Sequence, residues 1–132
     1  MRPDDLDAIR QTALDYIEGF YDGDGDRMER SLHPELAKRI GHPDPVSGRS
    51  HLAEMSALAL TQFARGRAGR PTPKAEQQKD VTVLDVFENA ASARIVASSW
   101  VDYLHLSRFN GRWVIVNVLW EMKPGQPFTP YW

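Results

Sequence analysis

The stretch SWVDYLHLSRFNGRWVIVNVLWEM, residues 99–122, predicts a β-hairpin. Its centre holds Asn110-Gly111, and both residues tolerate the positive φ that a two-residue type I′ turn requires. A turn there pairs Phe109 with Arg112 across the hairpin. Unbroken pairing outward gives Ser107 with Val114, His105 with Val116, Tyr103 with Val118 and Val101 with Trp120. Because side chains alternate along a strand, these residues are expected on one face of a sheet.

This predicted face has the character of a pocket wall. Two titratable polar side chains, Tyr103 and His105, stand on a surface that is otherwise apolar: Val101, Val114, Val116, Val118 and Trp120. A neutral imidazole can donate and accept hydrogen bonds, and a phenol can donate to a developing negative oxygen. The face predicts a ligand pocket with a Tyr/His polar corner. The structural alternative is a pair of buried polar groups satisfied by their neighbours.

A slip of one residue in the strand register would exchange the two faces. Asp102 would then enter the pocket, and His105 would lie on the other side of the sheet. With the register as counted, the second face carries Trp100, Leu104, Trp113 and Ile115 and is too apolar to lie bare in water. Such patches mark interfaces, so we predict a homodimer through this face. The C-terminal tail KPGQPFTPYW, with Phe128, Tyr131 and Trp132, is expected to extend along the sheet or over the neighbouring subunit.

Length and composition limit the class of protein. The 132 residues, 42% of them hydrophobic, predict a single domain over residues 1–132. A formal net charge of −2 gives no field to attract nucleic acid or an anionic membrane. The chain has no cysteine and no segment of the ~20 apolar residues that a membrane span needs. A cytoplasmic protein is the simplest interpretation.

The remaining elements follow from hydrophobic periodicity. Spacing of three and four residues predicts a helix over residues 3 to about 21, and Asp24 can cap a short second helix. Residues 33–48, rich in proline and glycine, are expected to be irregular. A third helix is expected from residue 50 to about 65 with Ser50 as its cap. Strands are expected at 81–87, 92–107 and 112–122, so the order predicts an α+β fold with helices on one face of an antiparallel sheet.

Several strings resemble the NTF2-like superfamily. They are ALDYIEGFYDGDGDRMERSLHPELAKR at residues 13–39, GRSHL at 48–52 and WVDYLHLSRFNGRWVIVNVLWE at 100–121. The sequence most resembles the "putative lumazine-binding" branch, also grouped with SnoaL-like proteins. The resemblance implies an NTF2-like cone, in which N-terminal helices pack on a curved sheet. The branch name does not identify the ligand of this chain, since function resides in sites and not in folds.

Comparison with the steroid isomerases of this superfamily implies roles for individual residues. His105 falls where those enzymes carry a protonated carboxylic acid, Trp120 falls on an aromatic of the pocket wall, and Tyr16 matches the tyrosine that binds the developing oxyanion. The general base of the isomerases would be an acid near Ile40, and isoleucine cannot take a proton. The sequence therefore argues against steroid-type isomerisation.

Motifs for other chemistry are missing from the sequence. His33, His42 and His51 lack the spacing of a metal site, and His33 is expected at the pocket mouth. DGDGD at residues 22–26 fails as a calcium loop, because Arg27 stands where that loop needs glycine. No nucleophile elbow, phosphate loop or dinucleotide fingerprint is found. We expect no metal and no cofactor.

The sequence thus predicts a small-molecule-binding protein with an apolar pocket. The expected ligand-binding residues come from the first helix, the HPEL loop and the hairpin: Tyr16, Phe20, His33, Leu36, Tyr103, His105, Val116 and Trp120. One alternative is an enzyme of the SnoaL or isomerase type, with His105 as general acid or base and Tyr16 as hydrogen-bond donor. Another is a dimeric interaction module whose pocket is filled by side chains.

Overall fold

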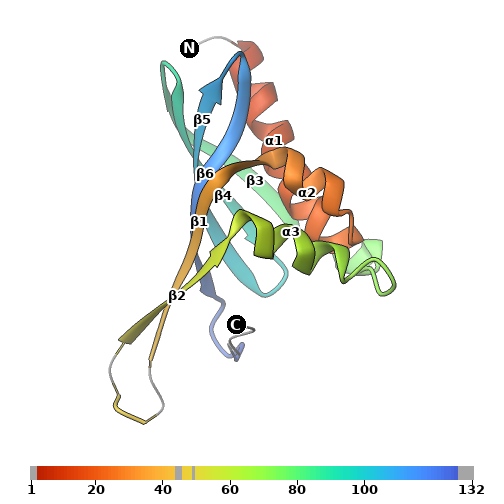
Figure 1. Cartoon of the computed structure of the whole chain (residues 1–132), viewed down its shortest axis with the longest axis vertical. Coiled ribbons are helices and arrows are strands. Elements are labelled where there is room, and N and C mark those ends of the chain that lie inside the picture. The colour runs from red at the N-terminus through yellow and green to blue at the C-terminus, as the bar shows by residue number, and fades with distance from the viewer. Residues whose placement is uncertain (1–2, 44–45, 49, 128–132) are drawn as a thin grey trace.

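Three helices cover one face of a curved six-stranded sheet (Figure 1). The computed structural model describes residues 3–43, 46–48 and 50–127. The strand order is β2-β1-β6-β5-β4-β3, and all neighbours are antiparallel except β1 and β6, which run parallel. The predicted α+β fold with helices on one face of a curved sheet is confirmed, with this one parallel pair added.

The N-terminal helices form as the sequence predicts. Helix α1 spans Pro3–Asp22 and α2 spans Gly25–Ser31. The Asp24 side chain accepts the backbone N–H of Arg27 at 3.1 Å and so caps α2. Gly23 between the helices has φ +70°, and a Cβ there would lie 2.5 Å from the Ala68 backbone. Both the dihedral angle and the close approach therefore require glycine at this turn.

The segment expected to be irregular is instead a long strand, and part of the third predicted helix is a strand as well. Strand β1 spans Leu32–Pro43 and pairs with β2 (Ser50–Ser56) on one side and with β6 on the other. Pairing on both sides overrides the weak local signal of the prolines. Helix α3 covers only Ala57–Arg65, and Ser56, not Ser50, is its cap, accepting the Ala59 N–H at 3.1 Å.

The C-terminal half is an antiparallel meander. After the short 3₁₀ helix η1 (Lys74–Glu76) come β3 (Lys79–Phe87), β4 (Ala90–Ala97), β5 (Trp100–Phe109) and β6 (Arg112–Met122). The strand predicted over residues 92–107 is therefore two strands, separated by a tight turn at residues 98–99. The predicted tail contacts of Phe128, Tyr131 and Trp132 lie outside the described residues.

The β5–β6 hairpin contains the feature that positions the candidate site. Asn110 and Gly111 have φ of 51° and 77°, as a type I′ turn requires. Pairing runs as predicted from Phe109–Arg112 to Ser107–Val114, and then the register shifts between His105 and Leu106. Leu106 pairs with Ile115 and His105 pairs with Asn117, so Val116 is an extra residue, a β-bulge. Beyond the bulge, every residue of β6 meets a partner one position away from the predicted one.

Candidate functional site

The face of β5 that points toward the helices differs from the predicted one. The even-numbered residues point toward the helices: Asp102 is 0% exposed, Leu104 1% and Leu106 2%. Tyr103 is 46% exposed, and His105 also lies on the exposed side of the sheet. The structure therefore has the alternative register arrangement, with Asp102 inside and His105 outside.

The residues assigned to the dimer face belong to this inner side. Leu104, Trp113 and Ile115 are buried in the hydrophobic core, and Trp100 packs half-buried against it. The prediction that these four side chains form an outer face was wrong: they share one face, but it is the inner one, and the bulge brings Val118 and Trp120 of β6 to the same side. The homodimer stays a prediction, without the four residues that were assigned to it.

Asp102 is a buried carboxyl group with incomplete hydrogen bonding. The Trp100 indole Nε1–H donates to its Oδ2 at 2.8 Å. None of the described residues meets hydrogen-bond geometry with Oδ1. An unsatisfied buried polar atom costs about 1–3 kcal/mol, and more when it is charged. Such a group marks a candidate site, because stability alone does not favour its retention.

Two further polar side chains complete the cluster, from different elements. Tyr16 on α1 is 2% exposed, and its hydroxyl accepts a hydrogen bond from the Lys38 ammonium of β1 at 2.6 Å. The Lys38 Nζ also lies 5.2 Å from the centre of the Tyr16 ring and 5.1 Å from that of Trp120. Lys38 itself is partly buried, and we call Tyr16, Lys38 and Asp102 the buried triad.

The triad residues shift one another's pKa values in directions that burial dominates. Burial raises the pKa of Asp102, and Lys38, Trp100 and Tyr16 oppose that rise only in part. Burial lowers the pKa of Lys38, against the attraction of the Asp102 carboxylate. Burial and then Asp102 raise the pKa of Tyr16 well above its ordinary value. Burial thus brings the pKa values of Asp102 and Lys38 closer together.

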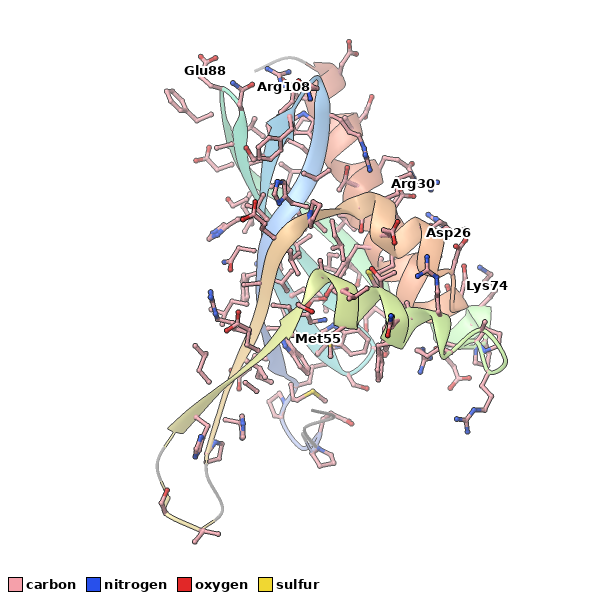
Figure 2. The ribbon with its side chains drawn as sticks, viewed as in Figure 1. Asp26, Arg30, Met55, Lys74, Glu88 and Arg108 are labelled. Atoms are coloured by element: carbon pink, nitrogen blue, oxygen red, sulfur yellow. The ribbon has the colours of Figure 1, made fainter. Side chains whose placement is uncertain are left out.

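Strand pairing holds Lys38 in place. It pairs with Met55 of β2 on one side and with Val118 of β6 on the other. Figure 2 labels Met55, which lies beside the start of α3, on the side of the sheet that the helices cover. A rigid strand in the middle of three aligns the Lys38 side chain more precisely than a loop would.

The remaining predicted site residues fall into two groups. Leu36 and Trp120 are buried in the core, and Phe20 packs against it, stacked on Phe63 at 5.9 Å and edge-on to Trp100 at 5.3 Å. Val116 is the bulge residue and is half-buried. The structure brings Tyr16 and Trp120 together around Lys38 and separates them from Tyr103 and His105.

His33 lies at the other end of β1, against the hairpin turn. Its Nδ1 accepts the backbone N–H of Glu35 at 3.0 Å, and its ring centre is 5.0 Å from that of Phe109. It lines a surface pocket of about 460 Å³ with Phe109 and Arg112. His33 thus borders a pocket that does not include the buried triad.

His105 contacts its strand neighbour on the outer face. Its Nδ1 lies 3.2 Å from Asn117 Nδ2. Asp102, and not His105, is therefore the polar residue of β5 on the side of Tyr16. The position compared with the isomerase base, Ile40, is buried at 2% exposure and carries no titratable group.

The described part of the chain has neither a candidate metal site nor a helix that could span a membrane. No group of three or more His, Asp or Glu side chains could hold a metal ion there. No helix in that part is both long and apolar enough to cross a membrane.

Signals for the missed residues were present in part. The even positions of β5 carry Trp100, Leu104 and Leu106 and are more hydrophobic than the odd positions. This difference favours burial of the even face, which includes Asp102. Lys38 stands between Leu36 and Ile40 in a period-two pattern typical of a strand. The prolines and glycines around Lys38 instead led to the prediction of an irregular segment.

Several solved structures have the same fold. An NTF2-like protein of unknown function from Shewanella baltica OS155 has a TM-score of 0.71 at 20% identity, covering 95% of this chain and 98% of its own. One from Silicibacter pomeroyi DSS-3 also has a TM-score of 0.71, at 17% identity over 93% and 100% of the two chains. An NTF2-like protein with a cystatin-like fold from Novosphingobium aromaticivorans has a TM-score of 0.61 at 15% identity over 93% and 84%. These likenesses show the fold.

Sequence comparison gives the family. No curated protein matches this chain. The profile of the family described as "Putative lumazine-binding" matches residues 4–121, which include every element from α1 to β6 and all three triad residues. The chain belongs to this "Putative lumazine-binding" family of the NTF2-like fold.

Proposed function

We propose that this protein binds a small molecule whose polar end contacts the buried triad of Tyr16, Lys38 and Asp102. The observation that carries the proposal is Asp102 Oδ1, an oxygen of a fully buried carboxyl group that meets hydrogen-bond geometry with none of the described residues, while Tyr16 lies near enough to lower the pKa of the carboxyl by hydrogen bonding. A ligand N–H or O–H donor would satisfy it. The family description supports binding of a small molecule, and the triad supplies the polar groups that fix orientation in such sites.

Lumazine is the first compound to test, because its heterocycle offers what the triad lacks. A ring N–H can donate to Asp102, and the adjacent carbonyl can accept from Lys38 or Tyr16. The aromatic faces of Tyr16 and Trp120, both near the Lys38 Nζ, suit a flat ring. The triad therefore matches a cyclic imide such as the one in lumazine.

The test is calorimetric titration of the protein with lumazine, comparing wild type with Asp102→Asn. The substitution keeps the side-chain shape but replaces one acceptor oxygen by a donor, so we expect affinity to fall at least tenfold, about 1.4 kcal/mol. Asp85→Asn is the matched control, because Asp85 is an exposed aspartate on β3 of the same sheet. Unchanged affinity in Asp102→Asn, or no binding to the wild type at millimolar lumazine, contradicts the proposal.

A further inference from the structure

Lys38 differs from the other lysines of the chain in what its amine contacts. Lys74 lies 3.1 Å from an Asp22 carboxylate oxygen, and Lys79 lies 2.6 Å from one of Glu18. Lys123 donates to the Gln78 side chain and to a backbone carbonyl. Lys38 donates instead to a phenol, among aromatic rings. Its amine therefore has the setting of a nucleophilic lysine, desolvated beside a proton-transfer group.

We propose that Lys38 is a nucleophile that forms a reversible imine with an aldehyde or ketone bound beside Tyr16 and Asp102. This inference rests on the proposed function, because it names a class of ligand for the same triad. A carbonyl carbon near Nζ would have its oxygen within reach of the Tyr16 hydroxyl, since the two triad atoms are 2.6 Å apart. The aromatic surfaces of Tyr16 and Trp120 favour a flat, apolar body on the carbonyl compound.

The charge balance of the triad supports an uncharged amine. Lys38 with Asp102 can exist as an ammonium and a carboxylate, or as an amine and a carboxylic acid, and both forms have zero net charge. Burial favours the second form, since it lowers the pKa of Lys38 and raises that of Asp102. The proposed reaction starts from this second form, in which Nζ is the nucleophile and Asp102 is the acid.

Addition proceeds through the hydroxyl of Tyr16. The Nζ lone pair forms a bond to the carbonyl carbon, and the C–O π electrons move to the oxygen. As this oxygen gains negative charge it takes the Tyr16 proton, and Tyr16 takes one from Nζ. The product is a neutral carbinolamine. Tyr16 ends the step as a phenol, which agrees with its raised pKa.

Dehydration uses Asp102. Its carboxylic acid protonates the carbinolamine hydroxyl, the C–O bond breaks, and water leaves. The nitrogen lone pair forms the C=N bond, and the resulting iminium lies beside the Asp102 carboxylate. Loss of the iminium proton to Asp102 gives the neutral imine. Amine and carbonyl are converted to imine and water, with no oxidant or reductant.

Reductive trapping tests the proposal. The full chain is incubated at pH 7 with benzaldehyde and sodium cyanoborohydride, which converts an imine to a stable benzylamine, and the modified lysines are located by peptide mass spectrometry. We expect benzylation of Lys38 at least tenfold faster than of Lys74, Lys79 or Lys123. Lys38→Arg should remove the fast modification and Lys123→Arg should retain it. Tyr16→Phe should slow benzylation of Lys38 at least tenfold and leave the exposed Lys74 unaffected.

Equal rates at the four lysines of the wild type would overturn the proposal, and this comparison needs no variant to fold. Titration of the same preparation with lumazine separates this inference from the proposed function. Lumazine binding that Asp102→Asn weakens, without fast benzylation, rejects the imine and keeps the binding site. Absence of both results rejects the triad as a ligand site.

Discussion

Two buried aspartates of this protein have opposite surroundings. Asp15 on α1 accepts hydrogen bonds from Gln11 at 3.1 Å and from Arg27 at 2.9 and 3.1 Å, and Arg30 approaches at 3.3 and 3.4 Å. Asp102 on β5 accepts a hydrogen bond from Trp100, and hydrogen bonding by Tyr16 also lowers its pKa, but its Oδ1 meets hydrogen-bond geometry with none of the residues that the structure describes. Asp15 has every feature of a structural carboxylate, and Asp102 lacks most of them.

The pKa values of Asp15 and Asp102 shift in opposite directions. Burial alone would raise the pKa of Asp15, but hydrogen bonds from Arg30, Arg27 and Gln11 outweigh it and lower that pKa. At Asp102 burial dominates and the pKa rises. Arg30, which Figure 2 labels on α2, and Arg27 one turn earlier supply the cations. Ionised hydrogen-bond donors thus compensate the burial of Asp15, and the burial of Asp102 is compensated only in part.

The largest expected effect comes from removing the well-paired carboxylate. Asp15→Ala leaves Arg27 and Arg30 without their shared partner, and hydrogen bonds to charged groups contribute about 1.5–3 kcal/mol. We expect the free energy of unfolding at pH 7, measured in urea, to fall by about 2 kcal/mol. Asp7→Ala, at an exposed position of α1, is the control and should change it by less than about 0.5 kcal/mol. If Asp15→Ala lowered the free energy of unfolding no more than Asp7→Ala does, the structural role assigned to Asp15 would be wrong.

Acid should reduce the effect of Asp15→Ala. Hydrogen bonds from Lys79 and Arg27 also lower the pKa of Glu18. Groups with a lowered folded pKa contribute stability above their ordinary values, 3.8 for Asp15 and 4.5 for Glu18, and lose it as pH falls through the folded pKa. The difference between wild type and Asp15→Ala should therefore shrink from pH 6 to pH 3 in urea titrations.

Asp102→Asn should have the opposite pH dependence. A raised folded pKa costs stability as pH rises above the ordinary value of 3.8, because the unfolded chain ionises more readily than the folded one. Relative to wild type, Asp102→Asn should gain stability between pH 3 and pH 7. Parallel curves for wild type and this variant would show that burial of Asp102 has no energetic consequence.

We expect the smallest effect on the free energy of unfolding when both Asp102 and Lys38 lose their ionisable groups. Replacing a buried ion pair by uncharged side chains is often neutral or stabilising. Asp102→Asn combined with Lys38→Met should leave the free energy of unfolding within about 1 kcal/mol of wild type, or raise it. A loss as large as that of Asp15→Ala would identify the triad as a structural ion pair.

Much of the fold could be predicted because its signals are local. Asn110-Gly111 specifies the hairpin turn, and Asp24 caps α2 as expected. The strand β1 could not be predicted so easily, since Pro34 and Pro43 weaken its local signal and pairing with β2 and β6 forms it. Tertiary contacts outweigh intrinsic preference in strands.

The candidate site was predicted only in part, and the reason is physical. Tyr16 and Trp120 were expected, but the opposite face of β5 was assigned to them. Val114, Ile115 and Val116 are all β-branched and apolar, so alternation cannot show that one of them is extra. An amphipathic strand would have shown the change of face, and a uniformly apolar one does not.

The bulge at Val116 also affects comparison among relatives. A homologue lacking the bulged residue would present the same β5 side chains to its helices, because Leu106–Ile115 and His105–Asn117 would then be consecutive pairs of a regular ladder. An alignment that omits the gap would match buried positions of one protein with exposed positions of the other. A single-codon insertion can thus be taken up as a bulge, so that the interior and exterior side chains of the two strands keep their sides while the surrounding fold persists.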